Sequence, residues 1–473
     1  MNGEKHTVHA GPPERRQSQS EETGNILEIA SALAREICSQ EHQLPRHIDP
    51  SDGVLEDRIG VCISDEGHEF NRVVEALRHL VLTTPSSAGD SFFNQLFGGR
   101  DPVATLAEML TPVLNSSMYT FKVAGPQVLV ELEVLDRMAQ KVGFRDGEGT
   151  FVPGGSIANL VAMIIARNQA DPGARDEGVS CKRLTAYTSD QSHYSIRKNA
   201  GLIGIGRDSV RKVSTDAQGH MIVEDLRRLI RDDRKAGRQP FFINATAGTT
   251  VLGAFDPIRD IAAVAHSEDL WMHIDGALGA SVLLSETHRH LLEGSELADS
   301  ITWNAHKMMG VPLSCSAILV KRRGLLSTHF NESATYLFQA NDDEFNPGTR
   351  SIQCGRRNDA LKLWAAWLFH GDGGYQKRID RLFELANYAA RKIAEDPDLT
   401  LTIQPESINV CLEVRGQSSA MICEKLDAES RLKISYGEAC GSSAIRLVCV
   451  NPDLDEDDID RVIAEIKTVA ASL

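Results

Sequence analysis

Short apolar runs alternate with longer amphipathic stretches through the middle of the chain. The runs 184–188, 241–245 and 270–275 have the length of buried strands, and the stretch 258–267 between two of them has helical spacing. Strands that alternate with helices favour a parallel sheet with both faces covered. The pattern therefore predicts an α/β domain in this region.

The two ends of the chain have different patterns. Residues 1–24 are polar and include a Pro-Pro pair, so a disordered tail is expected there. From 25 to 40 the apolar residues fall at helical spacing, which predicts a helix. Near the other end, strand-like runs at 408–414 and 444–450 alternate with helical stretches. They predict a smaller C-terminal domain.

Composition narrows the class of protein and its partners. The chain has 473 residues, 42% of them hydrophobic and 25% charged, with a net charge of −16. These values are ordinary for a globular protein, and the length allows two or three domains. The negative charge argues against non-specific nucleic-acid binding and against anionic membrane surfaces.

The nine cysteines are scattered and form no C-x-x-C pair, which is typical of free thiols in a reducing compartment. No apolar run reaches the length of a membrane span, and the N-terminus lacks an apolar signal core. A cytoplasmic location is therefore expected. His288 and His290 lie two residues apart and point to different faces of a helix, so no metal site is expected.

Two residues suggest chemistry. Asp275 ends one apolar run, and Lys307 lies 32 residues later, just past a second run. That spacing matches one strand–helix–strand unit, so both side chains can reach the same edge of a parallel sheet. Pyridoxal phosphate (PLP) requires a lysine for a Schiff base and a carboxylate for its ring nitrogen. Taken alone, the aspartate could equally be a turn residue and the lysine a solvated one.

A glycine-rich stretch, G-T-F-V-P-G-G-S-I-A-N at 149–159, precedes a predicted helix. Glycines allow close backbone approach, and free N–H groups at a helix start bind phosphate. A purely structural turn remains open. The stretch lacks the G-x-G-x-x-G and Walker spacings, which argues against dinucleotide and nucleoside-triphosphate sites.

Several motifs together resemble one family. They are N-A-H-K-M-M-G at 304–310, S-C-S-A-I-L-V-K at 314–321, T-A-G-T-T-V-L-G-A-F-D-P at 246–257 and H-Y-S-I at 193–196. In this order they resemble the group II PLP-dependent amino acid decarboxylases, among them the cysteine sulfinate and glutamate decarboxylases. The similarity extends over roughly residues 70–470.

The resemblance implies PLP as cofactor and fold type I, with a mostly parallel seven-stranded sheet in the large domain and a small C-terminal α+β domain. It implies a homodimer whose active site is shared between subunits. The expected organisation is a disordered tail at 1–24, a helical dimerisation segment at 25–84, a large PLP-binding domain at 85–345 and a small domain at 346–473.

The resemblance also implies roles for individual residues. Lys307 would hold PLP, His193 would stack on its ring, and Tyr336 in the loop 331–339 would return a proton after carbon dioxide leaves. The remaining cofactor contacts expected are Asp275, Ala277, Gly155, Ser156, Thr246, Asn304, His306, Cys354 and Gly355, the last two from the partner subunit. The substrate contacts expected are Arg446, on the α-carboxylate, and Phe93, Asn94, Gln95, Ser117 and Tyr119.

The implied reaction is decarboxylation of a short acidic L-amino acid. Cysteine sulfinate or aspartate is expected first, giving hypotaurine or β-alanine, and glutamate is the alternative, giving 4-aminobutyrate. Transamination or oxidative decarboxylation with the same cofactor, and a cofactor-free structural homologue, are further alternatives. Tyr336 favours plain decarboxylation, and the set of Asp275, Lys307 and His193 argues against a cofactor-free protein.

Three positions depart from the family pattern. Ala305 stands where the family has proline before the histidine, and Gly276 stands where it has alanine after the aspartate. The third departure is T-F-K-V-A-G-P at 120–126, which includes Lys122. Because that segment is expected near the substrate, it leaves the exact substrate open.

Overall fold

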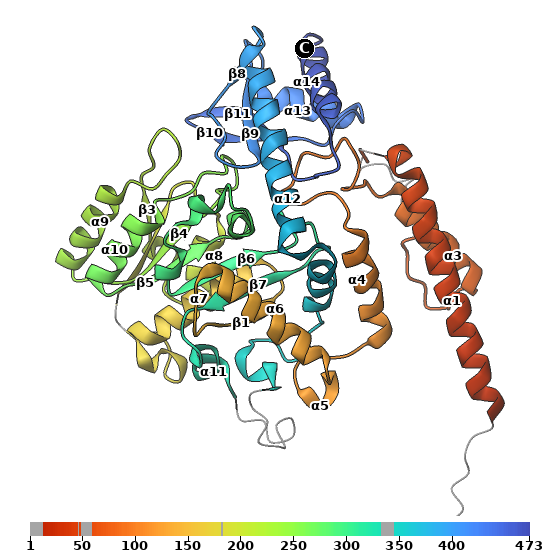
Figure 1. Cartoon of the computed structure of the whole chain (residues 1–473), viewed down its shortest axis with the longest axis horizontal. Helices are drawn as coiled ribbons and strands as arrows, with labels where there is room; N and C mark the ends of the chain where they lie inside the picture. The colour runs from red at the N-terminus through yellow and green to blue at the C-terminus, as the bar shows by residue number, and fades with distance from the viewer. Residues whose placement is uncertain (1–12, 46, 49–58, 181–182, 333–344) are drawn as a thin grey trace, which may run out of the picture. The chain divides into compact units, whose positions relative to one another are not determined.

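The computed structural model describes residues 13–45, 47–48, 59–180, 183–332 and 345–473, which form two units. The first unit is Met1–Gly89 and the second is Asp90–Leu473. Their elements are shown in Figure 1.

The first unit consists of helices. Helix α1 (Pro13–Gln40) is followed by the 3₁₀ turn η1 (Glu41–Gln43) and by α3 (Phe70–Thr83). Helix α1 confirms the helix predicted over 25–40. It also begins earlier than predicted, at Pro13. The disordered tail predicted for residues 1–24 stays a prediction, and residues 1–12 lie outside the described residues.

Contacts within this unit are mainly polar. Arg78 of α3 forms an ion pair with Glu36 of α1. The apolar side chains of Phe70, Val73 and Leu77 on α3 are exposed. An exposed apolar stripe on a helix is usually covered by another surface, and the predicted dimerisation role of this segment stays a prediction.

A seven-stranded mixed sheet forms the centre of the second unit. Its strand order is β1-β7-β6-β5-β4-β2-β3. The strands β3, β2, β4, β5 and β6 pair in parallel, whereas β7 runs antiparallel to both β6 and β1. The strands are β1 (Glu148–Val152), β2 (Leu184–Ser189), β3 (Val210–Val213), β4 (Gln239–Thr246), β5 (Trp271–Asp275), β6 (Ser300–Asn304) and β7 (Ser316–Val320). The predicted mostly parallel seven-stranded sheet is confirmed.

Helices cover both faces of this sheet, and alternate strand residues point into two different cores. Ile243 of β4 and Met272 of β5 join the core formed with α6, α9, α10 and α12. Their neighbours Phe242 and Trp271 join the core formed with α7, α8 and α11. The helices are α4 (Pro102–Leu114), α5 (Phe121–Ala124), α6 (Gln127–Val142), α7 (Gly155–Ala170), α8 (Ser195–Leu202), α9 (Val223–Lys235), α10 (Ile258–Glu268), α11 (Leu325–Phe330) and α12 (Ala360–Glu395). The 3₁₀ helices are η2 (Pro172–Arg175), η3 (Arg207–Ser209), η4 (Gly279–Leu284), η5 (Arg289–Leu292), η6 (Ser295–Leu297) and η8 (Pro347–Arg350).

A second, antiparallel sheet lies toward the C-terminus, with the order β10-β11-β9-β8. It packs with α13, α14 and the second half of α12 around a separate core. The elements are β8 (Leu399–Leu401), β9 (Asn409–Val414), α13 (Ser419–Ala428), β10 (Ser435–Ala439), β11 (Ser442–Val448) and α14 (Glu456–Ala470). This arrangement confirms the predicted α+β portion at the C-terminus.

Two features join the two sheets. Helix α12 contributes Leu363 to the core of the large sheet and Leu385 to the second core. Gly371, with φ of 62°, interrupts the helical conformation between them, and positive φ favours glycine. Phe93 comes from early in the unit and is nevertheless fully buried in the second core. The predicted limits of the two domains otherwise stay a prediction. No helix among the described residues is long and apolar enough to cross a bilayer.

Candidate active site

Three neighbouring parallel strands end at one edge of the large sheet, and polar residues lie at their ends. Thr246 of β4 pairs in register with Asp275 of β5, and Asp275 pairs with Thr302 of β6. Lys307 follows β6 in a turn. The carboxyl ends of parallel strands form the usual ligand crevice of such sheets. The fold therefore brings Asp275 and Lys307 to one edge, as their spacing predicted.

A cavity of about 200 Å³ lies at this edge. Most of the residues predicted to contact the cofactor line it; the exceptions are His306, Cys354 and Gly355. The full lining is Gly155, Ser156, Asn159, His193, Tyr194, Thr246, Gly248, Thr250, Asp275, Ala277, Asn304 and Lys307.

The carboxylate of Asp275 is buried and is held by two donors. The side-chain amide of Asn159 donates to Oδ2 over 2.8 Å, and the backbone N–H of Ala277 donates to Oδ1 over 3.2 Å. Burying a carboxylate is costly unless it is hydrogen-bonded, and these two donors satisfy both of its oxygens. Asn159 lies on α7, so the first helix after the glycine-rich turn fixes the carboxylate at the end of β5.

Hydrogen bonds continue from Asn159 into the sheet. His273 Nε2 lies 3.0 Å from Asn159 Oδ1, and His273 Nδ1 lies 2.8 Å from Ser300 Oγ. Burial lowers the pKa of His273 to about 4, so the ring is neutral at pH 7 and carries one N–H. Because Asn159 Oδ1 can only accept, Nε2 carries that hydrogen and Nδ1 accepts from the Ser300 hydroxyl.

The indole of Trp271 donates to Ser300 Oγ over 2.9 Å, which completes a chain of donors. Each group from Trp271 through Ser300, His273 and Asn159 donates to the next, and the last acceptor is Asp275. Hydrogen bonds that point the same way polarise one another. The chain therefore stabilises negative charge on Asp275 from inside the core.

Lys307 is the cationic residue of the cavity wall. Removal from water lowers the pKa of its amine below the ordinary value of 10.5. The charge of Asp275 opposes this shift, and the positive Arg446 adds to it. A lowered pKa makes the unprotonated, nucleophilic amine more available near neutral pH.

His193 borders the same cavity at the start of α8. Its ring packs on that of Tyr194 with centroids 4.1 Å apart, and its Nδ1 accepts from the backbone N–H of Ser195 over 3.3 Å. Burial lowers the pKa of His193, with a smaller contribution in the same direction from Lys307 and an opposing one from Asp275. A neutral flat ring in the cavity wall is suited to stacking on an aromatic ligand.

The glycine-rich turn brings backbone close to the other side of the cavity. Gly154 has φ of 109°, and α7 begins at Gly155. A Cβ at Gly155 would come within 2.9 Å of the Asn304 side-chain nitrogen, so this position has no room for a larger residue. The free N–H groups of the first turn of α7 form a site for an anionic group.

Arg446 comes from β11 of the second sheet. Its guanidinium donates to the carbonyl of Thr250 over 2.7 Å, to the carbonyl of Asn94 over 2.5 Å and to Ser435 Oγ over 3.1 Å. Its Nε is buried without a hydrogen bond among the described residues. Since Thr250 lines the cavity, the structure places a largely buried cation next to it.

Several predicted contacts lie elsewhere in this chain. Phe93 is fully buried in the second core, and its predicted contact with substrate stays a prediction. The backbone carbonyl of Asn94 accepts a hydrogen bond from Arg446. Gln95 is exposed. Tyr119 packs against Gly348, and Ser117 Oγ accepts from the backbone N–H of Arg356 over 3.4 Å. None of these residues lines the cavity.

The remaining cofactor candidates also lie outside the cavity lining. His306 is buried with Nδ1 3.0 Å from the backbone nitrogen of Cys315, and burial lowers its pKa to about 4. Its predicted contact with the cofactor stays a prediction. Cys354 and Gly355 are exposed. They were expected to reach the cofactor of a partner subunit, which stays a prediction. Tyr336 lies outside the described residues.

The structure explains two of the departures from the family pattern. A Cβ at Gly276 would lie 2.9 Å from the carbonyl oxygen of Thr302 on the neighbouring strand, so glycine is required by close packing. The backbone N–H of Ala305 donates to the carbonyl of Cys315 over 2.9 Å, a bond that proline cannot make. Lys122 is exposed on α5 and is not part of the cavity lining.

Sequence reasoning missed the residues that hold Asp275 in place. Asn159 and His273 are the main ones. Asn159 could have been noticed, because it is an amide within a mainly apolar stretch of a predicted helix. His273 gave no such signal, since a histidine in an apolar strand has many possible partners. Thr302 and Ser300 became part of the site only through the pairing of β5 with β6.

Comparisons with known proteins agree with this geometry. Residues 55–415 match the model of the pyridoxal-dependent decarboxylase conserved domain. The chain is 39% identical to cysteine sulfinic acid decarboxylase of Mus musculus over 443 residues, covering 89% of this chain and 90% of that protein. It is 37% identical to acidic amino acid decarboxylase GADL1 of Mus musculus, covering 89% and 80%.

Solved structures show the same fold. A crystal structure of mouse CSAD superposes with a TM-score of 0.90 at 34% identity, covering 95% of this chain and 100% of that one. Oryza sativa TDC, solved with PLP and tryptamine, gives a TM-score of 0.86 at 21% identity, with 98% and 99% covered. The second likeness bears on the fold alone.

The cavity also fits PLP on its own geometry. Asp275 would face the ring nitrogen, Lys307 the aldehyde and the first turn of α7 the phosphate. Asn304 Oδ1 is buried in the wall without a hydrogen bond among the described residues, so a polar ligand can satisfy it.

Replacing Asn159 with Leu is expected to lower the free energy of unfolding by about 2–3 kcal/mol, because the buried carboxylate of Asp275 loses a charged hydrogen bond. Urea denaturation of the cofactor-free protein measures this. Asn358→Leu is the matched control: this buried amide bonds only neutral groups, Gln127 and the backbone of Leu361. Equal losses in the two variants would show that the carboxylate has no special dependence on Asn159.

Replacing Lys307 with Met is expected to stabilise the cofactor-free protein at neutral pH. Because the pKa of Lys307 is lower in the folded state, the unfolded chain binds more protons, and wild-type stability rises with pH up to about 10.5. The difference in the free energy of unfolding between Lys307→Met and wild type should therefore become smaller as pH rises. Lys377→Met, at an exposed position on α12, is the control. A difference in unfolding free energy between wild type and Lys307→Met that stays constant with pH would contradict the expectation.

Proposed function

Because the chain belongs to the pyridoxal-dependent decarboxylase family, we propose that it removes the α-carboxylate of a short acidic L-amino acid as carbon dioxide. Cysteine sulfinate and aspartate are the preferred substrates in this proposal, and glutamate is the alternative. The observation that carries the proposal is the placement of Asp275 and Lys307 in the wall of one cavity at the sheet edge.

Bound PLP supplies an aldehyde that captures amines and a protonated ring that accepts the electron pair left when carbon dioxide departs. The chain supplies the positions of the groups around it. Lys307 would hold the cofactor through its side-chain amine, and burial lowers the pKa of that amine. Asp275, which accepts hydrogen bonds from Asn159 and Ala277, would face the ring nitrogen and keep it protonated. His193 covers one face of the ring and excludes water.

Arg446 is proposed to bind the α-carboxylate of the substrate. All the groups that it bonds are neutral, and among the described residues no carboxylate forms an ion pair with it. A buried cation without a counter-charge favours an anion, and a guanidinium fits a carboxylate with two parallel hydrogen bonds. The carbonyls of Thr250 and Asn94 fix the direction of that guanidinium.

Tyr336 is proposed to return the proton after carbon dioxide leaves, by resemblance to the family loop at 331–339. A phenol can act as a general acid only within hydrogen-bond reach of the carbon that receives the proton. Its role rests on the sequence motif alone.

The preference for acidic substrates is supported by the relatives. The curated proteins at 37–39% identity are named as decarboxylases of cysteine sulfinic acid and of acidic amino acids. Each comparison covers 89% of this chain. The order of preference among acidic substrates comes from these names and from the framework motifs.

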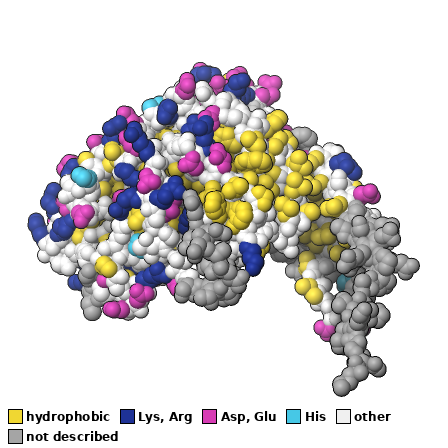
Figure 2. Space-filling view, turned by 60° about the horizontal axis from the view of Figure 1, so that its bottom comes forward, with side chains coloured by type: hydrophobic (Ala, Val, Ile, Leu, Met, Phe, Trp, Pro, Cys, Tyr) yellow, Lys and Arg dark blue, Asp and Glu magenta, His cyan; other side chains and the backbone are white. Residues whose placement is uncertain are grey.

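A homodimer with a shared active site is also proposed. Exposed apolar side chains gather on α4, on α5 and on the first half of α12, and Figure 2 shows a broad apolar area on this face. Helix α4 packs against α12. The exposed apolar side chains include Leu106, Met109, Leu110, Val113, Val123, Leu368 and Phe369. An apolar area of this kind marks an interface, and a second copy would also bring Cys354 and Gly355 to the cofactor phosphate.

A cytoplasmic location remains a prediction. It is supported by the eight described cysteines, all of which are free thiols.

The purified protein with PLP is expected to release carbon dioxide faster from cysteine sulfinate and aspartate than from glutamate. Lys307→Ala should lower the rate by more than about 10³-fold and abolish the visible absorbance of the bound cofactor. The measurement is isotopic carbon dioxide release from each acid, with neutral amino acids for comparison. A preference for glutamate would select the alternative, and an inactive wild type would overturn the proposal.

Introducing charge into the apolar area is expected to produce monomers. Leu106→Asp with Phe369→Asp should shift the mass measured by light scattering from two chains to one, because burying carboxylates in an apolar interface is unfavourable. Decarboxylation should fall with it, since the active site is shared. Met421→Asp with Leu297→Asp, also exposed apolar residues, is the control. A fully active monomer would contradict the shared site.

A further inference from the structure

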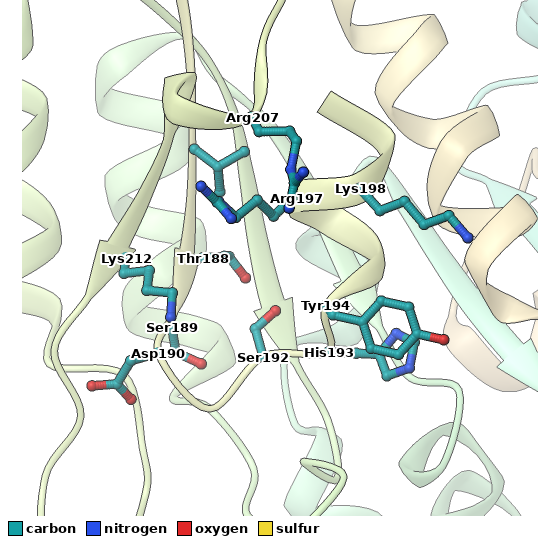
Figure 3. A pocket seen from close by; sticks show the side chains of 11 residues that line it. Thr188, Ser189, Asp190, Ser192, His193, Tyr194, Arg197, Lys198, Arg207 and Lys212 are labelled. Atoms are coloured by element: carbon teal, nitrogen blue, oxygen red, sulfur yellow. The ribbon is translucent and has the colours of Figure 1, made fainter. Parts of the chain in front are cut away.

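A second, larger cavity lies between α8 and the edge strand β3, next to the cofactor cavity. Its volume is about 510 Å³. The side chains that line it are shown in Figure 3: Thr188, Ser189, Asp190, Ser192, His193, Tyr194, Arg197, Lys198, Arg207, Val210 and Lys212. We refer to it as the basic pocket.

Positive charge dominates the basic pocket. Four cations line it, and Asp190 is the one carboxylate among the lining residues. Figure 3 shows the side chains of Arg197 and Arg207 converging, with the end of Lys212 near Ser189, whereas Lys198 points away from them. This cluster belongs to a chain whose net charge is −16.

The cations are largely free to attract a ligand. Arg197 forms an ion pair with the exposed Asp208 over 3.0 Å. Among the described residues no hydrogen bond or ion pair engages the side chains of Lys198, Arg207 or Lys212. The carboxylate of Asp190 accepts from Thr215 over 2.8 Å. An excess of uncompensated positive charge therefore remains in the pocket.

The basic pocket and the cofactor cavity share a wall. His193 and Tyr194 line both of them. A group bound among Arg197, Arg207 and Lys212 is thus separated from the cofactor cavity by the two rings at the start of α8. No other residue is common to the two linings.

We propose that the basic pocket binds the anionic substrate and concentrates it beside the cofactor cavity. The inference rests on the proposed function, because an amino acid with an acidic side chain carries a net negative charge at neutral pH. The net charge of the chain repels such a molecule, whereas a local cluster of cations in a concave surface attracts it. Arg207 and Lys212 are the residues that carry the effect, since neither is neutralised by a neighbour.

The physical signature of this role is its dependence on salt. Exposed charges act over about 30 Å at 0.01 M ionic strength and over only about 3 Å at 1 M. The contribution of the pocket should therefore be large in dilute buffer and vanish in concentrated salt. Cations that merely keep the surface solvated would leave the kinetic constants unchanged at every ionic strength.

The test uses the full-length holoenzyme with Arg207→Glu and Lys212→Glu combined. At about 0.01 M ionic strength the KM for the preferred acidic amino acid should rise by about tenfold, and near 1 M salt it should return to the wild-type value. The change should fall on KM rather than on kcat, because Arg207 and Lys212 do not line the cofactor cavity. Arg207→Lys with Lys212→Arg keeps the charge and should restore the wild-type KM.

Two controls separate the possible causes. Lys377→Glu with Arg415→Glu changes the net charge equally at exposed positions outside the pocket, and it should leave KM within twofold of wild type. An equal rise of KM in this control would assign the effect to net charge and overturn the proposal. An unchanged KM in Arg207→Glu with Lys212→Glu, measured on an active wild type, would overturn it as well. A wild type inactive on every acidic amino acid would refute the proposed function instead.

Discussion

A buried carboxylate at the end of β5 sets the main constraint on the structure around the cavity. The charge of Asp275 has to be balanced by donors, and water supplies few of them at this depth. Asn159 reaches it from α7, and His273 aligns Asn159 from within β5 itself. The helix that follows the glycine-rich turn and the strand that carries the carboxylate are therefore locked together. The same turn then presents its backbone N–H groups to the cavity at a fixed distance from Asp275.

The charges around the cavity have opposite effects on the pKa of Lys307. The site combines one carboxylate, Asp275, with the cations Lys307 and Arg446, and burial lowers the pKa of both cations. Arg446 and burial together make a protonated Lys307 unfavourable, and Asp275 limits that effect. The result is a lysine amine whose pKa is lowered and which loses its proton more readily than an exposed lysine. A buried lysine with a lowered pKa in a cavity wall favours chemistry at a primary amine.

The site is assembled from both sheets, although most of its residues come from the large one. Arg446 reaches it from β11, and its guanidinium is held by the carbonyls of Thr250 and Asn94. Asn94 follows Phe93, whose ring is buried in the second core. A segment from early in the unit thus packs with the C-terminal sheet and helps to fix the arginine. The packing of Phe93 therefore helps to position the Asn94 carbonyl that bonds Arg446, although Phe93 does not line the cavity.

The sequence by itself determined the order of strands and helices, the parallel sheet and the pair of Asp275 and Lys307, because local periodicity and spacing along the chain encode them. Residue types alone also indicated the glycine-rich turn, and the family motifs added His193 and Thr246. Only the tertiary structure decided which side chains meet across elements: Asn159 with Asp275, Arg446 with Thr250, and the basic residues of α8 and β3 around one pocket. It also placed Phe93 in the second core. Such contacts join residues far apart in the chain, and they depend on how helices pack against the sheet, which no local pattern of hydrophobic and polar residues specifies.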